Sequence, residues 1–233
     1  MKTPRHKQVV IFDFDGPILD SFEEGIRRLS SILSARGVVF GTRERARVCD
    51  EWGRPGRVML ESALGLPPTL AEQIYDVWVE LDNREPPPLV LGARAVLAWA
   101  HCNMLCTMLT SRHWADLQGA LIFHGLRDSF DLIQTADQGF FHKPDPRVFQ
   151  WTFRALANQI AHDTRVFFVG DTIADIEAGV AAGIETFLVQ NGPHDTGFIR
   201  AQGTTEAVRQ YFTCFPHRAL ATITELPERM EIT

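Results

Sequence analysis

The sequence predicts an α/β fold in which a doubly wound, Rossmann-like parallel sheet carries an inserted helical domain. Short apolar runs bounded by polar or turn residues recur along the chain, and such runs are typical of parallel strands buried on both faces. Segments with apolar residues at helical spacing alternate with these runs, as the crossover helices of a parallel sheet do. One long stretch near the N-terminus has helical spacing throughout, which indicates an insertion into this alternation.

The alternating part of the chain contains five expected strands, at residues 8–12, 104–109, 131–135, 165–169 and 185–189. Four crossover helices are expected to accompany them, at residues 93–100, 114–124, 146–156 and 174–182. Open parallel sheets bind ligands beyond the carboxyl ends of their strands. The residues that directly follow each strand are therefore the first candidates for a functional site.

The helical insertion extends from residue 21 to about residue 85 and ends at three consecutive prolines, 86–88. Its apolar positions recur at helical spacing, as in Ile26, Leu29 and Leu33. Consecutive prolines form a stiff extended element, which suits a linker back to the sheet. We therefore expect a core domain of residues 1–20 and 89–233 and an inserted helical domain of residues 21–88.

The C-terminal tail has a weaker pattern. We expect a loop over residues 191–197 and a short helix over residues 205–212. A last strand over residues 219–223 and a turn over residues 225–229 should follow.

The charged residues exclude several classes of function. Lys and Arg number 23 against 29 Asp and Glu, and the longest basic cluster is the RERAR run at residues 43–47. Proteins that bind nucleic acid or anionic membranes through electrostatics carry a larger basic surface than this. We therefore expect neither partner, and a small anionic substrate would require positive charge that is placed locally.

Two further features bear on location. No apolar run reaches transmembrane length, and the four apolar residues after MKTPRHKQ are too few for the core of a signal peptide. The four cysteines are not arranged as metal pairs and are interpreted as reduced thiols. We expect a cytoplasmic protein that is a monomer or a homodimer.

Acidic side chains follow two of the predicted strands. Asp13 and Asp15 follow the first strand, and Asp171 follows the fourth, with Asp175 one helical turn further on. Because the carboxyl ends of parallel strands meet at one edge, these carboxylates would repel one another there unless a cation joins them. A hard divalent cation with oxygen ligands resolves that conflict, and Mg²⁺ is the expected cofactor.

Polar residues from two other segments should reach the same edge. Thr110, Ser111 and Arg112 follow the second strand, and Lys143 lies between the third strand and a proline-rich helix start. Lys143 is one of only three lysines in the chain. Its ammonium would keep a nucleophilic carboxylate ionised and neutralise a phosphate oxygen.

Four motifs now occur in order: DFDGPILDS at residues 13–21, LTSR at 109–112, HKPD at 142–145 and GDTIAD at 170–175. They resemble the four motifs of the haloacid dehalogenase (HAD) superfamily of phosphohydrolases. The resemblance spans residues 9 to about 189, and the insertion resembles the helical cap domain of the phosphoglycolate phosphatase-like subgroup. It implies an enzyme that acts on a small phosphorylated metabolite.

The resemblance also implies catalytic roles. Asp13 would attack phosphorus and form an aspartyl-phosphate, while Asp15 would protonate the leaving alcohol and then deprotonate the attacking water. Lys143 would orient Asp13 and balance its charge.

Binding roles follow in the same way. The hydroxyl of Thr110, the adjacent Ser111 and the backbone amides of Phe14 and Asp15 would face the phosphoryl oxygens. Mg²⁺ would be held by Asp13, by the carbonyl of Asp15 and by Asp171, with Asp175 ordering a metal-bound water.

Several chemistries compete within the superfamily. Asp15 favours phosphoryl transfer over dehalogenation, and the absence of Lys between residues 21 and 88 disfavours the Schiff-base chemistry of phosphonate-cleaving relatives. A Mg²⁺-dependent phosphatase is the preferred interpretation. A phosphomutase of the β-phosphoglucomutase type is the first alternative, and a non-catalytic module that binds a phosphorylated ligand is the second.

Substrate choice should lie in the inserted domain, because the four motifs contact only the phosphate. Arg54 and Arg57, in the Gly-rich break CDEWGRPGR, are candidates for a substrate carboxylate or second phosphate, with Trp52 beside them. Arg112 is a candidate at the pocket entrance. Pro17 replaces the Thr that is usual in the first motif, so the turn into the cap is where this chain departs from the pattern.

Overall fold

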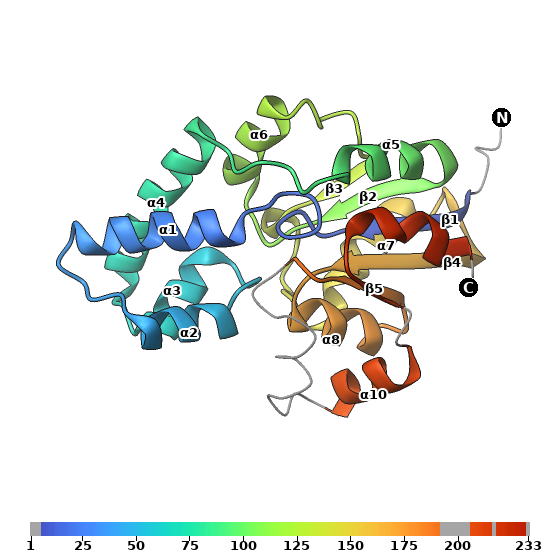
Figure 1. Ribbon diagram of the computed structural model, residues 1–233. Coiled ribbons are helices and arrows are strands. Elements are labelled where there is room, and N and C mark those ends of the chain that lie inside the picture. The colour runs from blue at the N-terminus through green and yellow to red at the C-terminus, as the bar shows by residue number, and fades with distance from the viewer. Residues whose placement is uncertain (1–5, 192–205, 216–217, 232–233) are drawn as a thin grey trace.

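The computed structural model describes residues 6–191, 206–215 and 218–231 (Figure 1). Its sheet has six strands in the order β3-β2-β1-β4-β5-β6, and all neighbours are parallel. The strands are β1 (His6–Phe12), β2 (Leu105–Leu109), β3 (Leu132–Gln134), β4 (Ile160–Gly170), β5 (Glu185–Val189) and β6 (Ala219–Leu220). The predicted α/β fold with a parallel sheet is thus confirmed. Since β1 lies between β2 and β4, the residues that follow these strands emerge side by side.

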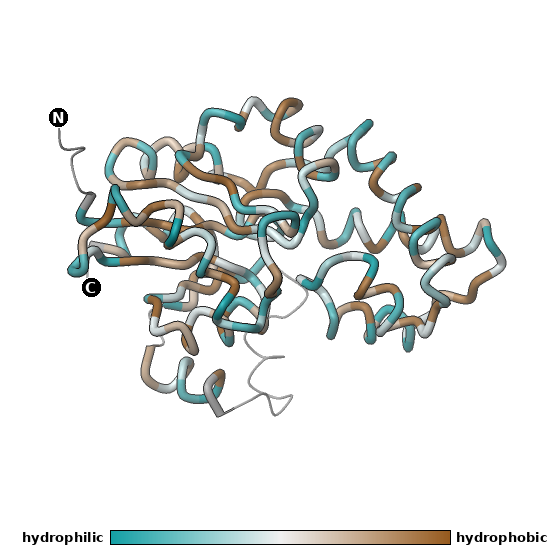
Figure 2. Tube along the Cα trace, turned by 180° about the vertical axis from the view of Figure 1, so that it is seen from behind, coloured by the Kyte–Doolittle hydropathy of each residue, from teal (hydrophilic) through white to brown (hydrophobic). Residues whose placement is uncertain are grey.

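Helices cover both faces of the sheet because successive strand side chains point to opposite faces. Val10 and Phe12 belong to the core under α5 (Ala93–Asn103), α6 (Trp114–Phe123) and α11 (Leu226–Glu231). Val9 and Ile11 belong to the core under η2 (Pro146–Phe149), α7 (Gln150–Leu156) and α8 (Ile173–Ala181). Finally, α10 (Glu206–Cys214) packs against α8 and β5. Figure 2 shows the hydrophobic residues concentrated along the strands.

The inserted segment forms four helices beyond one end of the sheet (Figure 1). They are α1 (Phe22–Ser34), α2 (Thr42–Asp50), α3 (Gly56–Leu64) and α4 (Pro68–Arg84). Their apolar side chains form a hydrophobic cluster separate from those of the sheet, with Leu29, Leu60 and Ile74 fully buried in it. The helical spacing noted in the sequence therefore reflects packing of these helices on one another.

The two connections between the insertion and the sheet run side by side. The amide of Asp20 donates to the carbonyl of Pro88 at 2.8 Å, and the amide of Val90 donates to the carbonyl of Ile18 at 2.9 Å. Leu19 and Leu89 form an antiparallel bridge between these bonds. The chain thus enters and leaves the insertion at one place, directly after the first motif.

The tail departs from the expectation. The helix over residues 205–212 is confirmed as α10, but the last strand is limited to Ala219–Leu220. The turn expected over residues 225–229 is wrong, since η4 (Ile223–Glu225) leads directly into α11. Glu225 accepts hydrogen bonds from the amides of Ala221 and Thr222, and this capping starts η4. Apart from Asn191, the loop expected over residues 191–197 lies outside the described residues.

Candidate active site

Asp13, Lys143 and Asp175 form a buried ionic cluster at the carboxyl edge of the sheet. Lys143 Nζ donates to Asp13 Oδ2 at 2.5 Å and to Asp175 Oδ1 at 2.7 Å. Asp13 follows β1, and its amide donates to the carbonyl of Val169 in β4. Lys143 comes from the loop between η1 (Ala136–Gln138) and η2, and Asp175 comes from α8. Three segments distant in the sequence therefore meet at the ammonium of Lys143.

Asp171 completes a group of acidic side chains that fits a divalent cation. Asp13, Asp171 and Asp175 each place one carboxylate oxygen within 4.8 Å of the others. Among the described residues, no hydrogen-bond donor reaches either carboxylate oxygen of Asp171, although the side chain is buried. A buried carboxylate without a partner is costly, and a cation with oxygen ligands removes that cost.

Because Gly16 has no side chain, the carboxylate of Asp171 can lie against its backbone. Gly16 has a φ of +90°, and a Cβ built at this position would lie 1.9 Å from Asp171 Oδ2. Residue 16 therefore needs both the conformational freedom and the small volume of glycine.

Burial and mutual repulsion set the protonation of the cluster. Burial, opposed by the charge of Lys143 and reinforced by that of Asp175, raises the pKa of Asp13 to about 7. Burial and the charges of Asp175 and Asp13 raise the pKa of Asp171 well above its ordinary value. Burial alone would lower the pKa of Lys143, but Asp13 and Asp175 outweigh it and raise that pKa. The lysine is thus held as an ammonium beside carboxyl groups that ionise reluctantly.

Asp175 also fixes the loop that presents Asp171. Its Oδ2 accepts hydrogen bonds from the Thr172 hydroxyl at 2.6 Å and from the amides of Thr172 and Asp171 at 3.0 and 3.2 Å. Thr172 in turn caps α8 through the amide of Asp175. Both oxygens of Asp175 therefore have protein partners, so its contribution is to position Asp171 and Lys143.

Asp15 is paired with Arg112, an interaction that the sequence did not reveal. Arg112 Nε donates to Asp15 Oδ2 at 2.8 Å, and its Nη2 donates to Asp15 Oδ1 at 2.7 Å. Burial alone would raise the pKa of Asp15, but the charge and hydrogen bonds of Arg112 lower it on balance. Arg112 also contacts Asp82 of α4 at 3.2 Å. The guanidinium therefore links the first motif to the inserted helices.

The turn after Asp13 is complete without an amide hydrogen at Pro17. The amides of Ile18 and Leu19 donate to the carbonyl of Phe14, and the amide of Gly16 donates to the carbonyl of Leu19. The amide of Phe14 itself donates to Asp13 Oδ1 at 2.7 Å. None of these bonds requires residue 17, so proline fits this turn.

Thr110 and Ser111 have different surroundings at the end of β2. Thr110 is buried, and its hydroxyl accepts a hydrogen bond from the amide of Arg112. The Ser111 hydroxyl donates to the carbonyl of Gly53, in the loop between α2 and α3, at 2.6 Å. Ser111 is thus engaged with the inserted segment, and Gly53 also packs against Thr172.

A cavity of about 90 Å³ connects these residues with the inserted helices. Arg54 lines this cavity and forms an ion pair with Glu51 at 3.1 Å. Arg57 is not among the lining residues, because its guanidinium lies over the ring of Tyr75 and contacts Asp76 at 3.2 Å.

Two residues of α4 contribute to the site without a motif that marks them. Asp82 joins Arg28 at 2.6 Å and Arg112 at 3.2 Å, and the Tyr75 hydroxyl donates to Asp116 Oδ2 at 2.6 Å. Burial and the charge of Asp116 raise the pKa of Tyr75, so its hydroxyl stays protonated. The available signal was a polar residue on the apolar face of a helix, which does not specify a partner.

In the part of the chain that the structure describes, no helix has the length and hydropathy needed to cross a membrane.

Known proteins share this architecture. A phosphoglycolate phosphatase from Mesorhizobium japonicum is 28% identical over 200 residues, which cover 81% of this chain and 85% of the relative. A solved hydrolase from Pseudomonas syringae has a TM-score of 0.75 at 20% identity and covers 96% of this chain and 98% of its own. A candidate β-phosphoglucomutase from Thermotoga maritima has a TM-score of 0.67 at 19% identity, and the match covers 97% of this chain and 99% of that structure's chain. At such identities the two structures show a shared fold. The family model for haloacid dehalogenase-like hydrolases matches residues 10–189, more than half of the chain, and the chain therefore belongs to that enzyme family.

Proposed function

We propose that the chain is a Mg²⁺-dependent phosphatase that hydrolyses a small phosphate monoester through an aspartyl-phosphate on Asp13. The observation that carries this proposal is the buried cluster in which Lys143 contacts Asp13 while Asp171 has no hydrogen-bond partner among the described residues. The similarity to a phosphoglycolate phosphatase supports the same reaction type.

The first step forms the covalent intermediate. A carboxylate oxygen of Asp13 attacks phosphorus as the bond to the alcohol oxygen breaks, and the proton that the alcohol needs comes from Asp15. Lys143 favours the ionised form of Asp13 and offsets the charge of the phosphoryl group. Thr110, at the end of β2, donates its hydroxyl to a phosphoryl oxygen.

The second step returns Asp13 to its starting state. Asp15, now ionised, takes a proton from water, and the resulting hydroxide attacks phosphorus as the bond to Asp13 breaks. Arg112 favours the ionised form of Asp15 that this step uses. The acid role in the first step requires the protonated form, so the pairing with Arg112 favours the second step over the first.

The metal would be held by Asp13, the carbonyl of Asp15 and Asp171, with Asp175 holding the Asp171 loop in place. When bound, Mg²⁺ supplies positive charge that neutralises both the carboxylates and the phosphoryl oxygens. We further propose that residues 21–88 act as a cap domain over a core of residues 1–20 and 89–233.

Hydrolysis of para-nitrophenyl phosphate by the purified protein tests this function. We expect turnover that requires Mg²⁺ and that falls at least about a thousandfold in Asp13→Asn, because the nucleophile is removed. Asp163→Asn, at an exposed acid of β4, is the matched control and should retain wild-type turnover. Wild-type turnover in Asp13→Asn would rule out the proposed intermediate.

Measuring the products and the released phosphate with the same purified protein distinguishes the two alternatives. A phosphatase releases one inorganic phosphate for each ester consumed, whereas a phosphomutase converts β-glucose 1-phosphate into glucose 6-phosphate and releases little phosphate. A non-catalytic module would bind phosphate esters with Mg²⁺ and consume none.

A further inference from the structure

The cavity beyond the phosphate end of the site is walled by aromatic rings. It extends from Asp13 and Asp15 to Trp52, Tyr75 and Trp78 of the inserted segment. Its volume is about 90 Å³, and about 10–15 Å³ of such space holds one water molecule. The cavity therefore has room for several waters or for one small organic group beside a phosphate.

The two tryptophans lie close together and are held by neighbours. Their ring centroids are 6.0 Å apart at an interplanar angle of 43°, and Phe22 meets Trp52 edge-on with centroids 5.0 Å apart. A Cβ on Gly25 of α1 would lie 2.8 Å from Trp52 and 2.9 Å from Trp78. Because residue 25 has no side chain, both indoles pack against the helix backbone, and they line the cavity together with Met59 and Val79.

Tyr75 is placed in the same manner. A Cβ on Gly56 would lie 2.2 Å from its ring, so the absence of a side chain at the start of α3 lets the ring lie against the backbone. The Tyr75 hydroxyl is fixed by Asp116. The aromatic wall is therefore rigid before any ligand binds, which lowers the entropic cost of binding.

The charged residues that line the cavity do not provide a site for a second anion. Arg112 is paired with Asp15 and Asp82, and Arg54 is paired with Glu51. Within the described part of the lining, no arginine lacks an acidic partner, and Asp116 adds a further carboxyl group. A carboxylate on the substrate alcohol would meet this charge without a free cation.

We infer that this site takes phosphate monoesters whose alcohol carries a flat uncharged ring, with Trp52 and Trp78 as the residues that select it. The inference rests on the proposed phosphatase function and specifies its substrate class. Rings stack on indole faces, and the aromatic contact adds to the gain from burying apolar surface.

A comparison of three esters tests the wild-type protein. Benzyl phosphate, ethyl phosphate and phosphoglycolate all release a primary alcohol, so their intrinsic reactivity is similar and differences in kcat/KM report on the cavity. With Mg²⁺ present, we expect kcat/KM for benzyl phosphate to exceed that for the other two at least about tenfold. Calorimetric titration should likewise show benzylphosphonate binding about tenfold more tightly than methylphosphonate.

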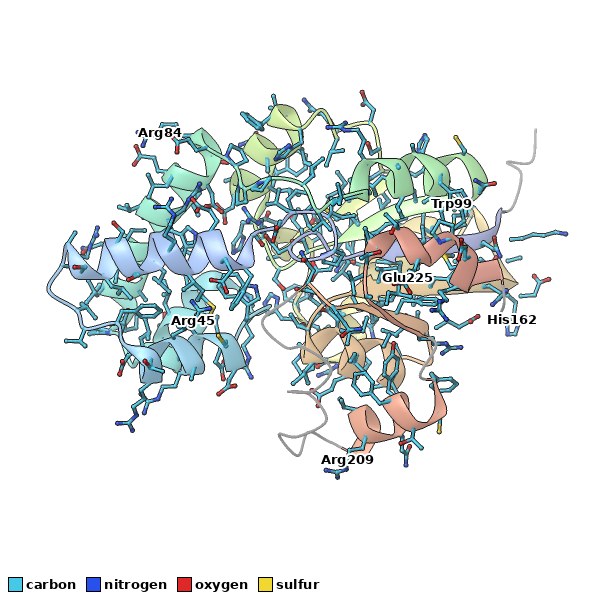
Figure 3. The ribbon with its side chains drawn as sticks, in the orientation of Figure 1. Arg45, Arg84, Trp99, His162, Arg209 and Glu225 are labelled. Carbon is cyan, nitrogen blue, oxygen red and sulfur yellow. The ribbon has the colours of Figure 1, made fainter. Side chains whose placement is uncertain are left out.

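Three variants locate the selectivity. Trp52→Leu and Trp78→Leu should each lower the ratio of kcat/KM for benzyl phosphate to kcat/KM for ethyl phosphate about fivefold to tenfold. Gly25→Ala should act in the same direction, because the new Cβ displaces both indoles. Trp99→Leu is the control, since Trp99 belongs to α5 and packs against the core of the sheet, away from the inserted helices that carry Arg45 and Arg84 (Figure 3).

The outcomes separate the inference from the function on which it rests. Hydrolysis of all three esters without preference, or preference for phosphoglycolate, overturns the inference and leaves the phosphatase proposal intact. Hydrolysis of none overturns the phosphatase proposal. The wild-type kinetics and phosphonate titrations need no variant, so they decide the inference even if a variant fails to fold. Folded tryptophan variants that keep the benzyl preference would exclude their role.

Discussion

Lys143 is the residue on which the charge balance of the site depends. It is buried and contacts Asp13 and Asp175, while Asp171 lies in the same acidic group. Without a cation here, the carboxyl groups would face one another in a region shielded from water. Its role as a structural counter-ion is therefore measurable apart from catalysis.

Replacing Lys143 by Met should lower the free energy of unfolding by about 3–5 kcal/mol, because it leaves buried carboxylates unpaired. Urea unfolding near neutral pH measures the change. Lys7→Met, at an exposed lysine of β1, serves as the control and should lie within about 0.5 kcal/mol of wild type. An unfolding free energy for Lys143→Met equal to that of wild type would contradict this role.

The sequence predicted which residues approach the site better than it predicted what they contact. Asp13 and Asp171 are placed by the ends of buried strands, and a strand end is visible as a switch from apolar to polar residues. The pairing of Arg112 with Asp82, and that of Arg57 with Asp76, depends on how the inserted helices pack. No local pattern encodes that packing.

Among the secondary-structure elements, α4 makes the contacts that hold the inserted helices against the sheet domain. Tyr75 bonds Asp116, Asp82 bonds Arg112, and the Asn83 amide donates to the carbonyl of Ala115. These residues lie along one face of α4, at i, i+7 and i+8. This face of α4 is therefore an interface with the sheet domain.

Asp82→Asn should weaken this interface and lower the free energy of unfolding by about 3 kcal/mol, since the buried guanidiniums of Arg28 and Arg112 lose a shared carboxylate. Asp76→Asn on the same helix is the matched control. Asp76 pairs with Arg57 at the surface, so its replacement should cost less than about 1 kcal/mol. Equal changes in the free energy of unfolding for the two substitutions would show that the contacts of Asp82 with Arg28 and Arg112 do not stabilise this interface.

Strands and helices whose apolar residues follow a regular spacing were predicted correctly. Those that depend on a capping interaction were not. Buried strands are apolar throughout and the helices of the insertion repeat at helical spacing, so both were recognisable. By contrast, η4 begins because Glu225 caps the chain at Ala221 and Thr222, and α11 follows η4 without a break. Its six residues are too few to show a period of their own.

At the scale of the whole molecule, protons and Mg²⁺ should compete for the acidic cluster. The pKa of Asp13 in the folded protein is about 7, above the ordinary value of 3.8, so the folded state holds a proton that the unfolded chain has lost. Stability from this group is therefore present at low pH and is lost as the pH rises toward and through 7 in the absence of metal.

Added Mg²⁺ should accordingly raise the melting temperature more at about pH 8 than at about pH 6, because the metal binds the ionised carboxylates. Thermal melts with Mg²⁺ and with a chelator measure the shift. Asp171→Asn should remove most of the shift and, at the higher pH without metal, should melt above wild type because it lacks a buried unpaired carboxylate. A Mg²⁺ shift that is the same at both pH values would contradict this competition.

The side-by-side connections at Ile18–Asp20 and Pro88–Val90 have a consequence for the modularity of the chain. The amide of Asp20 already touches the carbonyl of Pro88, so the ends left by excising the four inserted helices are within reach of a short glycine bridge. We expect such a shortened chain to keep the circular dichroism of an α/β protein and to hydrolyse para-nitrophenyl phosphate slowly, without preference for benzyl over ethyl phosphate. An excised chain that aggregates would show that the sheet relies on these helices for solubility. The residues that select the substrate would then lie in an insertion that can be deleted, because both of its ends join the sheet domain at the same place.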